Sequence, residues 1–352
     1  MQKNKDLIII NGRFLSQRIT GIQRFAYEIC CALQQIGVPF VILAPQNIDK
    51  DYDISALPVQ VIGLKGSHFW EQVTLPRYMK HHFNGHILLS LSGLSPLFYS
   101  RNIVAIHDIS YLLRPRSYSW AYCLYYQFMT PLVAKRAQKI LTVSAFSKDE
   151  LVRHLGIAPE KIAIVYNAVR PAPVLPRKQS ERYILSVASM VPRKNLKSLL
   201  QAYCSLSNPN FELYLAGGMH AVYANAELND FIGKKGVHFL GYVQEKELNN
   251  LYRNAIAYIN PSLYEGFGIP NVEAMMQECP LVVSDIPAFR EVCGDSALYF
   301  NPLCVADIQQ KINRIIHDEP LRKQLISEGT KQVSRFSWEK SAMEIKRIIN
   351  EL

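Results

Sequence analysis

Two carboxylates eight positions apart, Glu265 and Glu273, flank a loop that contains two glycines and precedes Pro270. Proline is tolerated in the first turn of a helix, so the sequence predicts a helix that begins near Pro270, with Glu273 in its first turn and Glu265 on the loop. The unpaired N–H groups at the start of a helix favour an anion, whereas carboxylates bind hydroxyls. The pattern therefore indicates a ligand that carries phosphate and sugar together.

A basic pair, Arg193 and Lys194, stands between a predicted strand and a predicted helix. Cations at the start of a helix oppose its dipole by several tenths of a kcal/mol each, so we expect an anion to join them. Arginine can hold diphosphate oxygens with two parallel hydrogen bonds, and lysine adds a point charge. An ordinary solvated basic loop is the alternative interpretation.

Glycines and polar residues that follow other predicted strands are weaker indications of a ligand site. Gly217 and Gly218 follow one apolar run and would let the backbone approach a ligand, although a plain turn explains them nearly as well. Gly241–Val243 follows another run and could present backbone groups to a nucleobase. His107 and Asp108 end an apolar run in the first half, where a lone histidine is more often a satisfied structural group.

Short apolar runs alternate with helix-period segments along the whole chain, which predicts an α/β protein with parallel sheets covered by helices. Strands are expected at 7–11, 40–44, 86–91, 103–107, 139–144 and 162–166, and again at 183–188, 211–216, 237–240, 255–259, 281–284 and 297–300. Helices are expected at 22–35, 71–80, 119–136 and 147–155, and three more within 306–352. In open sheets of this kind, ligands bind beyond the carboxyl ends of the strands, where the polar residues above lie.

The stretch from Arg170 to Arg182 contains three prolines and little to bury, and it predicts an interdomain linker. We expect an N-terminal domain at 1–170, a C-terminal domain at 171–335, and a final helix at 336–352 that docks back on the first domain.

These residues, taken in order, resemble the retaining glycosyltransferases of family 4, which have the GT-B architecture of two Rossmann-like domains with parallel sheets facing a central cleft. The resemblance spans nearly the full chain. Its N-terminal landmarks are Thr20-Gly21-Ile22-Gln23-Arg24, Ala105-Ile106-His107-Asp108, Val143-Ser144-Ala145-Phe146-Ser147 and Val165-Tyr166-Asn167.

The resemblance implies roles for individual residues. Arg193 and Lys194 would hold the donor diphosphate, Glu273 the nucleotide ribose, and Glu265 the hydroxyls of the transferred sugar, which it orients without acting as a nucleophile. His107 would reach the donor sugar. The remaining donor-binding residues are expected to be Gly21, Ser189, Gly217, Tyr242, Val243, Gly266, Phe267, Gly268 and Ile269, and weaker acceptor candidates are Asp108, Arg24 and Tyr111.

No metal or other cofactor is predicted. Asp51-Tyr52-Asp53 has the DxD pattern of another glycosyltransferase fold, but it lies in a polar loop and not at a strand end. The histidines show no metal-ligand spacing. The loop Gly266–Asn271 lacks the last glycine of a dinucleotide fingerprint, which argues against a nicotinamide enzyme.

The formal net charge of +10 is uneven, because residues 1–170 contain 19 Lys and Arg against 10 Asp and Glu. A basic first half favours an anionic partner or membrane leaflet over nucleic acid, and a soluble basic surface with no partner is the alternative. The aromatics of residues 111–128 are expected to be mostly core, since Trp120, Leu124, Phe128 and Leu132 keep helical spacing. The remaining aromatics are expected to lie at a membrane interface or to bind acceptor. No apolar run is long enough for a spanning helix or a signal peptide, so a cytoplasmic protein, with peripheral contact to the inner leaflet, is expected.

The sequence thus predicts a retaining glycosyltransferase that takes a sugar from a nucleotide diphosphate and gives it to a lipid-linked or oligosaccharide acceptor in surface polysaccharide synthesis. Thr20–Arg24 looks most like mannosyltransferases that use GDP-mannose. A nucleotide-sugar epimerase of the same fold and a non-catalytic nucleotide-sugar-binding protein remain as alternatives.

Overall fold

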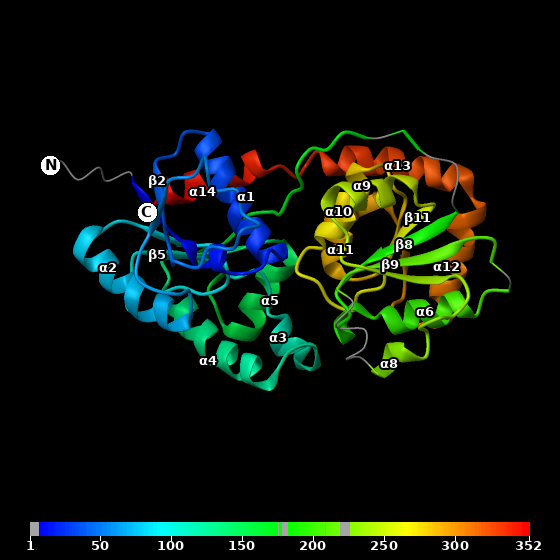
Figure 1. Ribbon diagram of the computed structural model, residues 1–352, viewed down its shortest axis with the longest axis horizontal. Helices are drawn as coiled ribbons and strands as arrows, with labels where there is room; N and C mark the ends of the chain where they lie inside the picture. The colour runs from blue at the N-terminus through cyan, green and yellow to red at the C-terminus, as the bar shows by residue number, and fades with distance from the viewer. Residues whose placement is uncertain (1–6, 175, 178–181, 208, 219–225) are drawn as a thin grey trace. The chain divides into compact units, whose positions relative to one another are not determined.

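The computed structural model describes residues 7–174, 176–177, 182–207, 209–218 and 226–352. The chain divides into two compact units, each built on its own parallel sheet (Figure 1). The first unit contains the chain up to Leu113 together with Ser119–Ala168 and Ser337–Leu352, and the second contains Arg114–Tyr118 and Val169–Phe336. None of the helices in these described ranges is long and apolar enough to cross a membrane.

The first sheet has seven strands in the order β3-β2-β1-β4-β5-β6-β7, and all of its pairs are parallel. The inner strand β1 begins with three isoleucines and has both faces buried, as expected of a strand covered by helices on each side. The strands are β1 (Ile8–Asn11), β2 (Phe40–Ala44), β3 (Val59–Val61), β4 (Leu88–Ser90), β5 (Asn102–Ala105), β6 (Lys139–Thr142) and β7 (Ile162–Ile164).

Ordinary capping signals mark both ends of helix α5 (Ala145–Leu155) in the first unit. Ser144 Oγ accepts a hydrogen bond from Ser147 N at 2.9 Å at the start of α5, and Gly156 ends that helix with a φ of 62°. The helical segments are η1 (Gly12–Ser16), α1 (Gly21–Gln35), η2 (Trp70–Thr74), α2 (Leu75–His82), α3 (Ser110–Leu113), α4 (Trp120–Arg136), α5 (Ala145–Leu155), η4 (Pro159–Lys161) and α14 (Trp338–Asn350).

The C-terminal helix α14 packs on α1 of the first unit. The rings of Trp338 and Phe25 lie edge to face with centroids 5.9 Å apart, and both are buried. Ser341 Oγ donates to the Tyr166 carbonyl at 2.7 Å. The chain therefore leaves the first unit near Ala168 and returns to it at Ser337.

The second sheet has six parallel strands in the order β10-β9-β8-β11-β12-β13. Its order reverses beside β8, as that of the first sheet reverses beside β1, and this is the doubly wound topology of Rossmann-like domains. The strands are β8 (Tyr183–Val187), β9 (Glu212–Ala216), β10 (Val237–Gly241), β11 (Ala257–Asn260), β12 (Leu281–Ser284) and β13 (Ala297–Phe300).

Helices α6 and α12 pack together against the core of this sheet through Leu199, Leu200 and Ile308, and α9 and α10 lie over its other side (Figure 1). The helical segments of the second unit are η3 (Pro115–Ser117), η5 (Pro192–Lys194), α6 (Leu196–Cys204), α8 (Ala226–Asn229), α9 (Glu245–Asn254), α10 (Ile269–Met276), α11 (Pro287–Cys293), η6 (Gly294–Ser296), α12 (Val305–His317) and α13 (Glu319–Val333).

The structure departs from the sequence-based expectations in three places. The short edge strand β3 was not expected, because a run of three residues is too short to give a clear strand signal. The expected helix at 71–80 is a π-helical turn followed by α2. The stripe Trp120, Leu124, Phe128 and Leu132 on α4 is exposed, so its assignment to the core was wrong.

Two further differences concern the chain between the units. The segment Arg114–Tyr118 belongs to the second unit, although it lies within the first half of the sequence. Of the expected linker, residues 175 and 178–181 lie outside the described residues, and the described remainder contains no helix or strand.

Candidate functional site

The loop between β11 and α10 is held by a network of buried polar side chains. Asn260, the last residue of β11, donates from Nδ2 to Asn271 Oδ1 at 2.8 Å and accepts from Ser262 N at 3.3 Å. Gly268 has a φ of 93°, and a Cβ there would lie 2.6 Å from the ring of Phe289. Glycine is therefore required for the loop to enter α10.

Glu265 lies on this loop, as predicted, and is 7% exposed. Its Oε2 accepts from Arg193 Nη1 at 3.1 Å, and its Oε1 accepts from Lys194 Nζ and, at 2.8 Å, from Ser262 Oγ. Three donors thus converge on one buried carboxylate. The basic pair and the glutamate are more than 70 residues apart in sequence, and the sheet brings them together.

The arrangement fixes the ionisation state of Glu265. Burial by itself raises the pKa of this carboxyl, but the positive charges of Lys194 and Arg193, with the hydrogen bonds from Lys194 and Ser262, outweigh burial and hold the pKa at about 2. Glu265 is therefore a carboxylate at any physiological pH.

The sequence predicted that an anion would join Arg193 and Lys194, and in this structure that anion is the Glu265 carboxylate. The main chain keeps the basic pair in place. Leu263 N donates to the Arg193 carbonyl at 2.8 Å, and Arg193 N donates to Ser117 Oγ at 3.1 Å. The short segment that contains Ser117 thus supports the basic loop within the second unit.

Glu273 lies one residue further along α10 than predicted, just beyond the first turn. The helix begins at Ile269, so Glu273 is its fifth residue and falls outside the first turn. Its Oε2 accepts from the hydroxyl of the fully buried Tyr252 at 3.1 Å. Burial, with the nearby charge of Glu273, raises the pKa of Tyr252 well above its ordinary value, so this hydroxyl is a permanent donor.

The other predicted donor residues lie at the carboxyl ends of neighbouring strands. Gly217 N donates to the Gly241 carbonyl at 2.7 Å, which ties the end of β9 to the end of β10. A Cβ on Gly217 would lie 1.9 Å from the Ala188 carbonyl oxygen, so this close approach needs glycine. Ser189 follows β8 and is exposed.

The other predicted donor-binding residues, which follow β10 and β11, differ in how far their side chains are exposed. Tyr242 is exposed after β10, and Val243 and Ile269 are half-buried. Gly266 and Phe267 are buried, and the Phe267 ring packs edge to face on Phe336 with centroids 5.3 Å apart. Phe267 therefore belongs to the core by its side chain.

In the first unit, His107 is buried two residues after β5 ends. Its Nε2 lies 3.0 Å from the Leu91 carbonyl, and its ring packs edge to face on Phe25 with centroids 4.8 Å apart. Burial lowers the pKa of His107, and the hydrogen bond to Leu91 and the charge of Asp108 oppose that effect. Asp108 Oδ1 accepts from both the N and Oγ of Ser110, at 2.8 and 2.6 Å.

The remaining first-unit candidates are spread along its helices. Gly21 is the exposed first residue of α1, and Arg24 is half-buried one turn later. Tyr111 is buried on α3 beside the ring of Tyr126, and burial raises its pKa to about 12. The second-unit candidates thus gather at one edge of their sheet, and those of the first unit follow β5 or lie on α1 and α3.

Sequence reasoning missed several residues that shape these sites. Ser262 and Tyr252 each donate to one of the two glutamates. The first unit also contains a buried ion pair, in which Arg13 Nε lies 3.2 Å from Glu71 Oε2 and Asn11 Nδ2 donates to Glu71 Oε1 at 2.8 Å. Asn11 ends β1 as Asn260 ends β11, and an asparagine after an apolar run was the signal that could have found both networks.

No group of three or more metal-binding side chains occurs within the part of the chain that the structure describes. Asp51 and Asp53 are exposed, and Asp53 accepts from Ser55.

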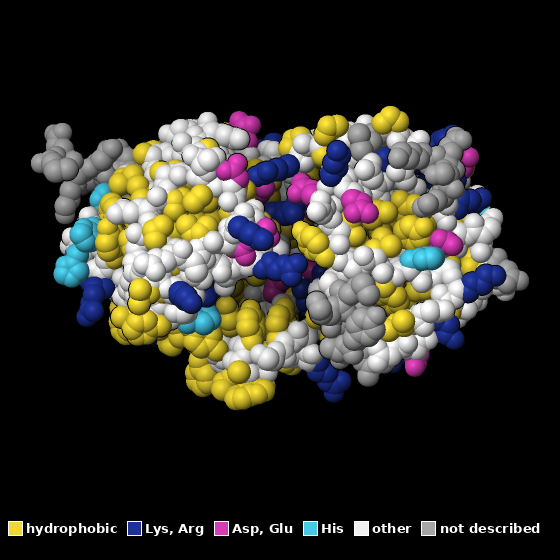
Figure 2. All heavy atoms as spheres, viewed as in Figure 1, with side chains coloured by type: hydrophobic (Ala, Val, Ile, Leu, Met, Phe, Trp, Pro, Cys, Tyr) yellow, Lys and Arg dark blue, Asp and Glu magenta, His cyan; other side chains and the backbone are white. Residues whose placement is uncertain are grey.

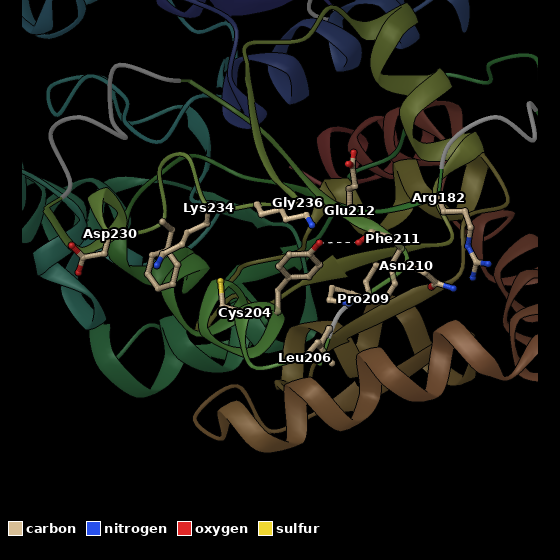
Figure 3. Close-up of a pocket in the computed structure, with 13 residues that line it drawn as sticks. Arg182, Cys204, Leu206, Pro209, Asn210, Phe211, Glu212, Asp230, Lys234 and Gly236 are labelled. Atoms are coloured by element: carbon tan, nitrogen blue, oxygen red, sulfur yellow. Dashed lines mark hydrogen bonds between the residues drawn. The ribbon is translucent and has the colours of Figure 1, made fainter.

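A cavity in the second unit lies apart from the candidate residues (Figure 3). Its lining includes Arg182, which precedes β8, Glu212, which begins β9, and Gly236, which precedes β10. The cavity therefore opens at the amino ends of these strands. Ligands of open α/β sheets bind at the carboxyl ends, where Arg193, Lys194 and Glu265 lie.

Two family models match consecutive parts of the chain. "Glycosyltransferase Family 4" matches residues 19–172, and "Glycosyl transferases group 1" matches residues 172–332. The O-antigen chain mannosyltransferase B of Escherichia coli is 31% identical over 268 residues, which are 69% of this chain and 70% of that relative. The O-antigen chain mannosyltransferase RfbU of Salmonella typhimurium is 35% identical over 209 residues, 59% of this chain and 58% of that relative's length.

Solved structures share the fold at lower identity. Anabaena HepE, in complex with UDP and glucose, has a TM-score of 0.77 at 16% identity and covers 99% of this chain and 100% of its own. WaaG, a glycosyltransferase involved in lipopolysaccharide biosynthesis, has a TM-score of 0.76 at 14% identity, covering 97% and 99% of the two chains.

Two doubly wound units that align with these structures define the GT-B fold, and the two family models show a glycosyltransferase. Within that fold, the chain belongs to the family 4, group 1 glycosyltransferases.

Proposed function

We propose that the protein is a retaining hexosyltransferase that moves mannose from GDP-mannose to a lipid-linked or oligosaccharide acceptor in surface polysaccharide synthesis. The observation that carries this proposal is the buried cluster of Glu265, Arg193 and Lys194 at the carboxyl edge of the second sheet. The cluster combines two cations suited to a diphosphate with a carboxylate suited to sugar hydroxyls.

The second unit is proposed to bind the donor. Arg193 and Lys194 contact the diphosphate, the backbone of Gly266–Gly268 contacts the phosphate and sugar, and Glu273 accepts from the ribose hydroxyls. Tyr252 holds the Glu273 carboxylate in place from the buried side. When donor binds, the two cations are shared between the diphosphate and Glu265.

In the proposed reaction, the bond between the anomeric carbon and the leaving phosphate oxygen breaks, and the acceptor oxygen bonds to that carbon on the same face. The acceptor proton passes to the leaving phosphate oxygen. Glu265 is paired with two cations and accepts from three side chains, so its charge is already engaged, which disfavours a role as nucleophile. Arg193 and Lys194 stabilise the charge that develops on the departing diphosphate.

The first unit is proposed to bind the acceptor and to present His107 to the donor sugar, with Gly21 leaving room for it and with Asp108, Arg24 and Tyr111 as acceptor contacts. His107 is neutral at pH 7, because burial lowers its pKa. Its single N–H, on Nε2, then donates to the Leu91 carbonyl, so Nδ1 is the ring nitrogen that would accept from a sugar hydroxyl.

The choice of mannose is supported by the two O-antigen mannosyltransferases that are 35% and 31% identical to parts of this chain. A lipid-linked acceptor would lie at a membrane surface, and the protein is therefore proposed to work in the cytoplasm at the inner leaflet.

The function is tested with two variants and a control. Glu265→Ala is expected to lower transfer from GDP-mannose by on the order of 100-fold or more while the folded protein still binds GDP. Glu273→Ala is expected to weaken GDP binding itself. Glu278→Ala, which removes a carboxylate that pairs with Arg253 and contacts none of the candidate residues, should leave both measurements near wild type.

Full transfer by Glu265→Ala would refute the assigned mechanism. A sugar altered in the absence of any acceptor would indicate an epimerase, and nucleotide-sugar binding without turnover would indicate a binding protein. Protection against thermal unfolding by a panel of nucleotide sugars identifies the donor, because a ligand of the native state raises its stability.

A further inference from the structure

Helix α4 of the first unit carries an exposed apolar stripe. Trp120 is 79% exposed, Leu124 47%, Phe128 68% and Leu132 49%. These residues recur every fourth position, so they lie along one side of the helix. Figure 2 shows hydrophobic side chains gathered at the lower edge of the first unit, where Figure 1 places α4.

The helix is apolar on its other side as well, where Cys123, Thr130, Val133 and Ala134 are buried in the unit. No charged residue occurs from Trp120 to Ala134. A helix at the surface of a globular domain ordinarily carries charged residues on its outer face. An uncharged outer face with large aromatic side chains marks a surface that is covered by a partner.

The charge of the surrounding chain identifies the kind of partner. From Gln72 to Lys148 the residues of the first unit include seven Lys and Arg and one acidic residue, Asp108, which already accepts two hydrogen bonds from Ser110. Lys135 and Arg136 are exposed at the end of α4 itself. An apolar stripe in basic surroundings complements the interface of an anionic bilayer, where hydrocarbon lies beneath negative headgroups.

We propose that the exposed stripe of α4 inserts into the headgroup region of an anionic bilayer, with the helix lying in the membrane plane. At about 1.5 Å per residue, its 17 residues extend roughly 25 Å along that plane. Trp120 and Phe128 enter the boundary between headgroups and acyl chains, and Lys135 and Arg136 pair with anionic headgroups. A second copy of the chain is a poorer occupant, because each copy carries a formal charge of +10.

Intrinsic fluorescence provides a direct test. The chain has three tryptophans, and Trp70 and Trp338 are buried while Trp120 is exposed. Adding vesicles of phosphatidylglycerol and phosphatidylethanolamine to the full chain should shift the emission to the blue, and brominated lipids should quench it. Vesicles of phosphatidylcholine alone should bind at least about tenfold more weakly. No donor or acceptor is present, so this result is independent of the proposed transfer reaction.

A variant and a matched control locate the surface. The double variant Leu124→Ser, Phe128→Ser keeps Trp120 as the reporter and should lower partitioning into anionic vesicles by about tenfold or more. Leu303→Ser with Met343→Ser changes two exposed apolar residues elsewhere and should bind like wild type. Circular dichroism and thermal unfolding confirm that both variants are folded.

Three outcomes would overturn the proposal. One is the absence of any blue shift with anionic vesicles. The second is equal vesicle binding by wild type and the Leu124→Ser, Phe128→Ser variant. The third is a concentration-dependent dimer, seen by sedimentation, that this variant abolishes, which would identify a second copy as the occupant.

Discussion

Replacing Glu265 with glutamine should change how the stability of the second unit depends on pH. The pKa of Glu265 lies at about 2 in the folded chain against an ordinary value of 4.5, and each tenfold change in the acid dissociation constant corresponds to about 1.4 kcal/mol. The ionised carboxylate therefore contributes roughly 3 kcal/mol of folding free energy at neutral pH.

The sign of this contribution follows from the direction of the pKa change. Because folding depresses the pKa, the contribution is fully present above about pH 5 and is lost as the pH falls toward about 2. Between pH 5 and pH 3, the wild-type chain should lose about 2 kcal/mol that Glu265→Gln does not lose, since glutamine does not titrate. The variant is expected to be less stable at neutral pH, but its stability should vary less with acid.

Amide hydrogen exchange of β11 measures this quantity, because exchange of a central buried strand reports the opening of its sheet. The opening free energy is compared at pH 5, 4 and 3 for the wild type, Glu265→Gln and a Glu278→Gln control. Glu278 pairs with Arg253 and is more exposed, so its removal should leave the wild-type slope nearly unchanged. Equal slopes for the wild type and Glu265→Gln would refute the electrostatic account of the Glu265 cluster.

Three further predictions concern single residues. Gly217→Ala places a Cβ 1.9 Å from a backbone carbonyl oxygen and should destabilise the second unit by about 2 kcal/mol or more in urea unfolding. Gly218→Ala, with open space at that position, should cost under about 1 kcal/mol in the same measurement. Equal costs for the two variants would contradict this packing. Because burial lowers the pKa of His107, the unfolded chain binds a proton more readily than the folded chain, and the wild type should become less stable as the pH falls below about 6.5. His107→Gln should not show this loss in thermal unfolding at different pH values. An unchanged pH profile would show that His107 does not titrate in this way. Tyr252→Phe removes one hydrogen bond to Glu273 and should weaken GDP binding by roughly threefold to tenfold, with thermal stability nearly retained; calorimetry measures both quantities. Unchanged affinity would show that this hydroxyl does not contribute to donor binding.

Short apolar runs in the sequence were sufficient to predict most strands and the strand ends that polar residues follow. Apolar runs such as Ile8–Ile10 are strands because both faces of a parallel sheet are covered, and the residues that follow them lie at one edge. Placing Glu265 near Arg193 and Lys194 needed only this rule. The hydrogen bonds of Ser262 could not be predicted, because they depend on side-chain directions within a loop.

The exposed stripe of α4 shows a limit of periodicity. Spacing by four places Trp120, Leu124, Phe128 and Leu132 on one side of a helix, but it does not say which side faces the core. The opposite side is also apolar, with smaller residues, and it is the side that packs inward. Similarly, Glu273 lies one residue further along α10 than predicted, because Pro270 fixes the start of the helix only to within a residue.

The return of the chain to its first unit has a consequence for biosynthesis. Helix α14 covers Phe25 of α1, and its Ser341 bonds to Tyr166, but more than 160 residues of the second unit are made between Ala168 and Ser337. During synthesis on the ribosome, the surface of the first unit that α14 covers stays exposed until the second unit has been made. A stable first unit expressed alone would therefore require residues 337–352 to be joined to residue 168 by a short linker.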